Sequence, residues 1–336
     1  MSRTLFVFLL FFSFFNTAAC RSKTEQPLDD KFRVALLTPG PVSDAGWNAL
    51  AYEGLLKIRD TLHAEVSQIE TKTPAEFEET FRDYANRGFQ LVFGHGFEFQ
   101  DAAARVGADY PHTVFITTSG NTVRTNVAPM RFLLEEATYL MGMMSAMLSK
   151  TGKAGAIGGM EIPPLKSTFL AFAAGAKSVK PDFQVVISYI GNWEDLGAAK
   201  QAAIALIEQN CDILLPNADA ASLGAFQAAR EKRVMALGTN KNQNDIAPEV
   251  IVASGVIDIP TAFLQVAQEV QNHTFRSRII RLGMKEGVIA LVYNPSWQNR
   301  LPADVLARVA AAKQQIVAGT LTVPSVEFTP NQANPS

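Results

Sequence analysis

The chain has 336 residues, of which 48% are hydrophobic, and 30 basic against 32 acidic side chains give a formal net charge of -2. This length and apolar content suffice for two domains with buried cores. The even charge balance, without a long basic run, excludes the electrostatic footprint of a nucleic-acid-binding protein.

Residues 1–19 predict a secretory signal peptide. Arg3 supplies a positive charge, residues 5–15 are almost wholly apolar but too few to span a membrane comfortably, and residues 17–19 are small. The polar stretch over residues 21–30 follows at once and has no core pattern. This stretch argues against a buried N-terminal helix.

Cys20 directly follows the small residues and resembles the lipidated cysteine of bacterial lipoproteins, although Thr17 stands where their motif has leucine. We therefore expect an exported protein, lipid-anchored to a bacterial membrane on its periplasmic or cell-surface side, with a tether over residues 20–31. An ordinary secreted protein is the alternative. Cys211 would then be the remaining cysteine, unable to form an internal disulfide and best explained as a core residue.

From residue 32 onward, short apolar runs alternate with amphipathic stretches of helical length. Strands are predicted over residues 33–37, 64–69, 91–93 and 114–117, and helices over residues 47–59, 74–87 and 99–108. Helices of this length between continuous apolar strands indicate βαβ units and a parallel sheet.

A methionine-rich helix is predicted over residues 138–149, and we expect it to pack in a core. A second series follows, with strands over residues 154–157, 184–189, 212–215 and 234–237, and helices over residues 163–179, 196–209 and 221–231. The chain thus repeats one architecture, which predicts two lobes that face a cleft. Open α/β sheets bind ligands beyond the carboxyl ends of their strands, so the loops there hold the candidate site.

No catalytic or metal-binding constellation stands out, so we expect no enzyme, no cofactor and no metal. No two histidines have a metal-ligand spacing, and there is no CxxC pair. Gly94 and Gly96 flank His95, but neither a P-loop lysine nor the dinucleotide fingerprint accompanies them.

Residues 43–48 join the first predicted strand to the first predicted helix and hold the most informative side chains. Asp44 is suited equally to capping the helix and to binding a ligand. Trp47 and Asn48 suit recognition of a flat polar ring, because the indole would stack on the ring and the amide would bond to its edge.

Residues 40–55 resemble the opening motif of the basic membrane protein family, the substrate-binding lipoproteins of ABC importers. Members often carry phenylalanine-asparagine where this chain has Trp47-Asn48. The resemblance spans nearly the whole mature chain, through residues 93–97 with Asp101, 149–153, 158–163, 172–175, 188–193 and 283–287. It implies an α/β protein of the type I periplasmic-binding fold, with two Rossmann-like lobes of parallel sheets joined by a three-segment hinge.

We expect the lobes to be assembled from separate parts of the chain. Lobe 1 would comprise residues 32–131 and 257–276, and lobe 2 residues 132–256 and 277–328. Residues 329–336 would form a flexible tail.

The resemblance implies purine nucleosides as the best-known ligand class and an ABC permease as the protein partner. By position, Asp44 and Asn48 would hydrogen-bond to the base, while Trp47 and Phe97 would stack on it. We expect a monomer that binds no nucleic acid.

The resemblance also implies roles for residues later in the chain. Asp101 would lie beside the pocket, Asn217 near the hinge, and Asn240 at the cleft end of a strand. Family members commonly have an acid near the position of Asn240 and a lysine within the segment aligned with residues 254–258, and this chain has neither. Asp219 could supply a relocated acid, although helix capping is the favoured interpretation of that side chain.

Without this acid and this lysine, we expect weaker binding of a ribose, whereas the aromatic side chains that would stack on a base are present. A purine nucleoside, a free nucleobase and riboflavin are therefore all candidate ligands. Trp193 lies just after the strand predicted over residues 184–189. It could border the entrance of lobe 2, but packing within the lobe is the favoured interpretation. The leading function is solute capture by hinge closure for an ABC importer. The alternatives are a sensing surface lipoprotein without transport and a nucleoside hydrolase. A DNA-binding regulator is excluded because no helix-turn-helix precedes the lobes.

Overall fold

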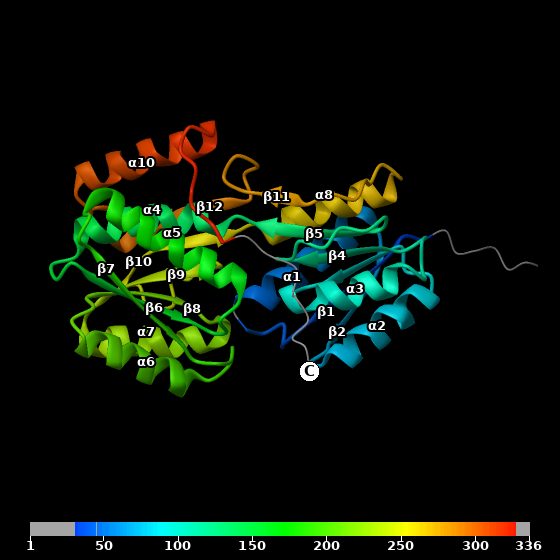
Figure 1. Ribbon diagram of the computed structural model, residues 1–336, viewed down its shortest axis with the longest axis horizontal. Helices are drawn as coiled ribbons and strands as arrows, with labels where there is room; N and C mark the ends of the chain where they lie inside the picture. The colour runs from blue at the N-terminus through cyan, green and yellow to red at the C-terminus, as the bar shows by residue number, and fades with distance from the viewer. Residues whose placement is uncertain (1–30, 45, 327–336) are drawn as a thin grey trace, which may run out of the picture. The chain divides into compact units, whose positions relative to one another are not determined.

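The computed structural model describes residues 31–44 and 46–326 (Figure 1). The predicted signal peptide, Cys20, nearly all of the tether and the tail at residues 329–336 lie outside these residues. All the described helices and strands belong to one unit that begins at Phe32. None of these helices is both long and apolar enough to cross a bilayer.

Lobe 1 is built on a parallel sheet of six strands in the order β11-β5-β4-β3-β1-β2. These strands are β1 (Arg33–Thr38), β2 (Glu65–Glu70), β3 (Leu91–Gly94), β4 (Val114–Thr118), β5 (Val127–Phe132) and β11 (Ile280–Leu282). Its helices are α1 (Trp47–Leu62), α2 (Pro74–Asn86), α3 (Gln100–Gly107) and α8 (Ile259–Gln271). Helices α1 and α8 pack together in one core cluster, and α2 and α3 pack in the other, so both faces of the sheet are covered.

Lobe 2 is built on a sheet of six strands in the order β12-β10-β9-β8-β6-β7, parallel except for the β10–β12 pair. These strands are β6 (Lys153–Gly158), β7 (Gln184–Tyr189), β8 (Ile213–Asn217), β9 (Met235–Asn240), β10 (Ile251–Ile257) and β12 (Ile289–Tyr293). Its helices are α4 (Leu134–Leu148), α5 (Pro163–Val179), α6 (Leu196–Glu208), α7 (Ser222–Lys232), α9 (Pro295–Gln298) and α10 (Ala303–Ala318).

The methionine-rich helix α4 packs in the core of lobe 2, as predicted. Met141 and Met144 are buried, and α4 lies directly against α5. A Cβ atom added at Gly142 would lie 1.9 Å from the carbonyl oxygen of Phe172, so glycine is what permits this close approach of the two helix backbones. Cys211 is also buried in a core cluster of lobe 2, which confirms the prediction for that residue.

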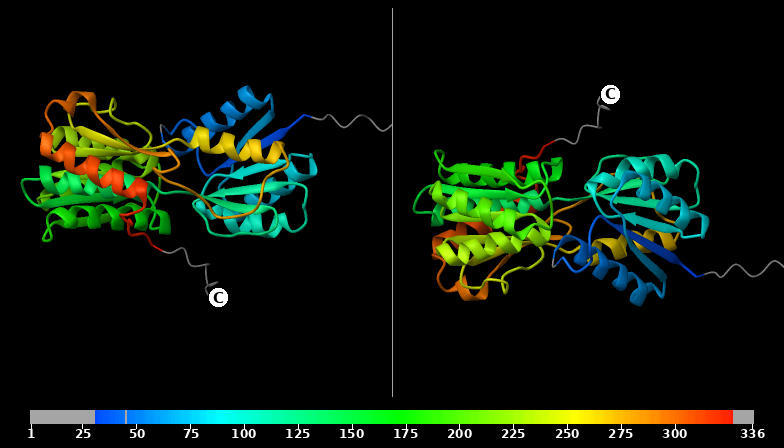
Figure 2. Two further views of the ribbon diagram at one scale, coloured as in Figure 1. Left: turned by 90° about the horizontal axis from the view of Figure 1, so that it is seen from above. Right: turned by 90° about the horizontal axis from the view of Figure 1, so that it is seen from below.

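Three crossings connect the lobes, which confirms the predicted fold class with its three-segment hinge. The chain crosses between β5 and α4, between β10 and α8, and between β11 and β12 (Figure 2). The crossing segments are hydrogen-bonded to one another, because the Leu133 amide donates to Leu282 at 2.9 Å and the Asp258 amide donates to Val288 at 2.8 Å. The hinge is therefore one bonded bundle of three segments.

The expected return to lobe 2 at residue 277 is corrected by the strand pairing. Ile280 pairs with Met130 and Leu282 pairs with Phe132, so β11 adds an edge strand to the sheet of lobe 1. Ile280 and Leu282 are buried whereas Arg281 between them is exposed, and this alternation fixes the short strand on lobe 1. The chain returns to the sheet of lobe 2 at β12.

Candidate ligand-binding site

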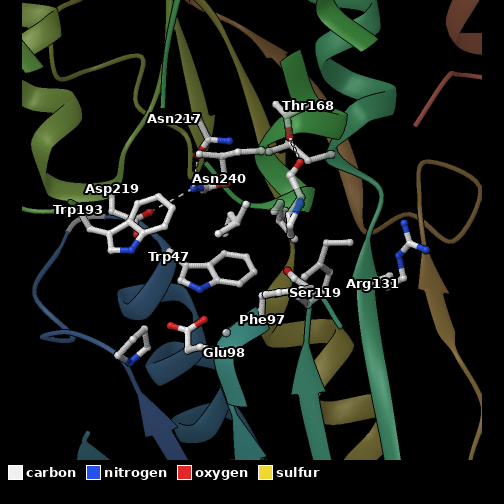
Figure 3. Close-up of a pocket in the computed structure, with 18 of the residues that line it drawn as sticks. Trp47, Phe97, Glu98, Ser119, Arg131, Thr168, Trp193, Asn217, Asp219 and Asn240 are labelled. Atoms are coloured by element: carbon white, nitrogen blue, oxygen red, sulfur yellow. Dashed lines mark hydrogen bonds between the residues drawn. The ribbon is translucent and has the colours of Figure 1, made fainter. Parts of the chain in front are cut away.

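A cavity of about 790 Å³ lies at the carboxyl ends of the strands of both sheets. Lobe 1 contributes Trp47, Phe97, Glu98 and Ser119 to its wall (Figure 3). Lobe 2 contributes Thr168, Trp193, Asn217, Asp219 and Asn240 (Figure 3). The position of this cavity is the one expected for a ligand of open α/β sheets.

Trp47 begins α1, and its indole is held on two sides by other rings. Its ring lies 4.1 Å from the ring of His95, with an angle of 24° between the planes, and the ring of Phe132 meets it edge-on at 5.9 Å. The indole is half-buried and also lines the cavity. One part of its surface is therefore available to a ligand while another part is fixed by the protein.

His95 is fully buried beneath Trp47 and is hydrogen-bonded at both ring nitrogens. Its Nε2 lies 3.0 Å from the backbone carbonyl of Trp47, and its Nδ1 lies 3.3 Å from the hydroxyl of Thr118. Burial lowers the pKa of His95 to about 3, so the imidazole is neutral at physiological pH. Nε2 then donates to the carbonyl, and Nδ1 accepts from the hydroxyl.

Trp193 lines the cavity from lobe 2, and the expectation that it only packs within the lobe needs correction. Its indole lies over the backbone of Gly159, where an added Cβ atom would be 2.1 Å from Cε3 of the ring. Any side chain at position 159 would displace the indole. Phe97, the first residue of the 3-10 helix η1 (Phe97–Phe99), lines the same cavity from lobe 1.

Two carboxyl side chains face the cavity, one from each lobe. The carboxyl of Glu98 lies over Gly96, where an added Cβ atom would be 2.4 Å from Oε2, and it borders the open space of the cavity. Asp219 begins the 3-10 helix η2 (Asp219–Ala221) after β8. Desolvation by the surrounding protein raises the pKa of Glu98, although the residue as a whole keeps an exposed surface. Burial, and then the charges of Asp44 and Glu98, raise the pKa of Asp219 well above its ordinary range.

Asn217 and Asn240 end the adjacent strands β8 and β9 and are bonded to each other. The Nδ2 group of Asn240 donates to Oδ1 of Asn217 at 3.2 Å and to Oδ1 of Asp219 at 3.4 Å. Both asparagines line the cavity, so the amide of Asn240 positions the carboxyl of Asp219 within the wall.

Three residues of the cavity wall have left-handed backbone conformations. Ser119 has φ of 67°, Asp219 of 47° and Asn240 of 68°, and each lies at or just beyond the end of a strand. Non-glycine residues rarely adopt such conformations, which concentrate at ligand-binding and catalytic sites. This concentration supports the assignment of the cavity as the functional site.

Asp44, Asn48 and Asp101 do not line the cavity. The Asp44 carboxylate accepts hydrogen bonds from the amides of Gly46, Asn48 and Ala49 at 2.8–3.0 Å, so it caps the start of α1. Asn48 is buried behind Trp47 and its Oδ1 has no hydrogen-bond partner among the described residues. Asp101 is exposed in the first turn of α3.

Glu135 and Arg131 line the cavity beside the hinge, and the sequence interpretation included neither of them. Burial raises the pKa of Glu135 to about 7, although the positive charge of Arg131 opposes this shift. Burial also lowers the pKa of Arg131. The hinge side of the cavity therefore holds a carboxyl that titrates near neutrality.

The two lobes contact each other beside the cavity. The Nζ atom of Lys241, which follows β9, lies 2.7 Å from Oε1 of Glu53 on α1. Elsewhere, Oε1 of Glu194 in lobe 2 comes within 3.6 Å of the position that a Cβ atom of Gly40 in lobe 1 would occupy. The two lobes therefore approach each other closely at these two places.

Comparisons with known proteins agree with this architecture. The family model for the PnrA-like substrate-binding proteins of ABC transporters, the Bmp family, matches residues 31–327. A protein of Brucella abortus named as purine-binding is 28% identical over 296 residues, covering 87% of this chain and 83% of its own length. The nucleoside-binding protein BmpA of an ABC transporter of Lactococcus lactis is 25% identical over 336 residues, covering 92% and 94%.

Among solved structures, an ABC-transporter solute-binding protein of Aeropyrum pernix has the same fold. It superposes with a TM-score of 0.79 at 22% sequence identity, covering 88% of this chain and 94% of that protein.

Proposed function

Because this chain belongs to the Bmp family of PnrA-like ABC transporter substrate-binding proteins, we propose that its cavity captures a purine nucleoside or a related flat heterocycle. The family consists of solute-binding proteins and not enzymes, so the function is capture and delivery without chemical change of the solute. The mechanism is closure of the two lobes around the ligand.

The aromatic wall is the observation that carries this proposal. Trp47 from lobe 1 and Trp193 from lobe 2 both border the cavity, and Phe97 adds a third ring. Stacking of a nucleobase on an aromatic side chain contributes about 1–3 kcal/mol to binding. Two aromatic side chains on opposite lobes suit a planar ligand that contacts both lobes at the same time.

Closure follows from the division of these contacts between the lobes. A ligand that touches Trp47 and Trp193 together binds the closed state better than the open state, and this difference shifts the population toward closure. The three hinge segments allow such a motion because each sheet remains intact while the crossings bend. A permease that recognises the closed form would then receive only loaded protein.

One of the two relatives is named as purine-binding and the other as nucleoside-binding, so only the second name includes a sugar. The chain has Asn240 where an acid would suit two ribose hydroxyls, and the amide of Asn240 is already bonded to Asn217 and Asp219. We therefore keep a nucleoside, a free nucleobase and riboflavin as candidate ligands of one site.

We also propose that Cys20 carries a lipid anchor and that the mature protein acts as a monomer with an ABC permease. The polar stretch after Cys20 supports a tether between the anchor and the lobes. Mass spectrometry of the mature N-terminal peptide would reveal a diacylated cysteine, and an unmodified cysteine would contradict this part of the proposal.

The ligand is testable in two steps. Small molecules released by denaturing protein purified from its native membrane are identified by mass spectrometry, and their affinity is then measured by calorimetry with the same protein stripped of ligand. We expect a purine nucleoside, a nucleobase or a flavin. Recovery of a non-planar solute, together with no binding of any of these three classes, would overturn the proposed function.

A further inference from the structure

We propose that the cavity selects an amino-substituted heteroaromatic ring, whose N–H groups face Glu98 and Asp219, and that it rejects phosphorylated ligands. This inference rests on the proposed function and narrows its substrate class. Both carboxyl side chains line the cavity (Figure 3). They project from opposite lobes, so a ligand group that lies between them would contact both lobes of the protein.

Neither carboxyl has a cationic partner in the part of the protein that the structure describes. Among the residues that the structure describes, no lysine, arginine or histidine forms an ion pair with Glu98 or Asp219. The contact to Asp219 from a neighbouring side chain is the 3.4 Å hydrogen bond from Asn240. Burial raises the pKa of both carboxyls, and ligand N–H groups favour the ionised forms because charge-assisted hydrogen bonds are the stronger kind.

The remaining charges of the cavity reinforce this preference. Its described lining includes the carboxyls of Glu98, Glu135 and Asp219 and one guanidinium, that of Arg131. Asp44 lies behind this wall, close enough for its charge to act on Asp219. An added phosphate would place further negative charge near these carboxyls, so a nucleotide is disfavoured relative to its nucleoside.

Closure brings the like charges together. Asp219 belongs to lobe 2, whereas Glu98 and Asp44 belong to lobe 1, and Oδ1 of Asp219 reaches within 4.0 Å of the Cβ position of Gly46 at the start of α1. Without a ligand, ionisation of these carboxyls opposes closure. An amino group between the carboxyls offsets the repulsion, while a ring carbonyl at the same place would face two acceptors and leave them unpaired.

The test compares ligand pairs that differ by an amino group against a carbonyl at one ring carbon. Adenine is compared with 1-methylhypoxanthine and adenosine with 1-methylinosine by calorimetry on the full chain, and AMP is compared with adenosine. The N1-methyl group removes the ring N–H donor that an oxo purine otherwise carries. We expect each amino compound to bind at least about tenfold more tightly than its oxo partner. AMP is expected to bind more weakly than adenosine by a similar factor or more.

The variants Glu98→Gln and Asp219→Asn assign the selectivity to these side chains. An amide can donate to a ring carbonyl, so either variant is expected to reduce the preference for the amino compound to within about threefold. Glu79→Gln is the matched control, because Glu79 is exposed on α2 and outside the cavity lining, and the preference is expected to be unchanged.

The outcomes separate this inference from the proposed function. Equal or tighter binding of the oxo compounds, or a preference that both variants retain, overturns the inference and leaves capture of a planar ligand intact. Absence of binding by every purine and flavin overturns both.

Discussion

The imidazole of His95 supports the indole of Trp47 twice, by ring stacking at 4.1 Å and by a hydrogen bond from Nε2 to the Trp47 backbone carbonyl at 3.0 Å. The same residue therefore fixes the ring and the main chain at the start of α1. His95 itself follows β3, so the rigid sheet of lobe 1 positions the aromatic wall of the cavity. This support has energetic consequences that can be measured.

Trp47→Ala is expected to weaken ligand binding by roughly 1–3 kcal/mol, because the stacking surface on lobe 1 is lost. Calorimetry with the ligand recovered from the native protein measures this loss. Trp297→Ala is the control, since Trp297 lies in α9 and outside the cavity lining. Unchanged affinity in Trp47→Ala would remove this indole from the binding site.

The buried imidazole of His95 is expected to make stability depend on pH. Its pKa is about 3 in the folded protein against an ordinary value of 6.5, so the unfolded chain takes up the proton first. The free energy of unfolding should therefore fall as pH decreases from 6.5 toward 3, by up to about 1.4 kcal/mol per pH unit from this group.

Urea unfolding of the native protein and of His95→Gln at pH 7.5, 6.0 and 5.0 isolates this contribution. His95→Gln should be less stable than the native protein at pH 7.5, and the difference should shrink at pH 5.0 because glutamine does not titrate. A difference that stays constant over this range would contradict the assignment of a neutral buried imidazole.

Glu135→Gln is expected to act in the opposite direction. The pKa of Glu135 is about 7 in the folded protein against 4.5 ordinarily, so its contribution to the free energy of unfolding falls as pH rises from 4.5 through 7. The glutamine variant lacks this loss, and its melting temperature relative to the native protein should be higher at pH 8 than at pH 5. The same relative melting temperature at both values would show that Glu135 is not desolvated.

The ion pair between Lys241 and Glu53 links the lobes beside the cavity, and its loss should favour the open state. Both side chains are partly exposed, so the pair contributes only about 0.2–1 kcal/mol. Lys241→Glu is expected to lower ligand affinity by roughly twofold to fivefold in 50 mM salt, and by less in 0.5 M salt because of screening. The double variant Glu53→Lys/Lys241→Glu restores the opposite charges and should recover affinity. Failure of this rescue would argue against a closing role.

Much of the fold could be predicted because the helices and most strands have local signals. The predicted elements up to residue 237 are present, with ends shifted by a few residues. The strands β5, β10 and β12 and the helices α8, α9 and α10 were not predicted. Pro129 and Gly255 interrupt the apolar patterns of β5 and β10. The three-residue strand β11 has no pattern of its own, and pairing with β5, about 150 residues earlier, decides its lobe.

The candidate site could be predicted only in part. Position after a strand was a good guide to the cavity wall, where Trp47, Phe97, Asn217 and Asn240 lie. Position after a strand does not show which side chains of a loop point into the cavity. Asp44 turns back onto the amides of α1, whereas Trp193, placed by the backbone of Gly159, faces the cavity.

Asp219 and Glu98 also required three-dimensional information. The sequence favours capping of the helix predicted over residues 221–231 for Asp219, but its side chain borders the cavity and accepts a hydrogen bond from Asn240, which ends a different strand. Glu98 lies one residue after Phe97 within an apolar segment, and no local pattern marks it as a cavity residue. The proximity of these two carboxyls, which belong to different lobes, can be recognised only in the three-dimensional structure.

The division of each sheet between distant parts of the chain has a consequence for biogenesis. Lobe 1 is completed only by α8 and β11, so a nascent chain that ends before Ile280 lacks an edge strand of its first sheet and all of β12. Neither half can finish its core early during synthesis. Both sheets are therefore completed only when β11, the third crossing segment and β12 have been synthesised.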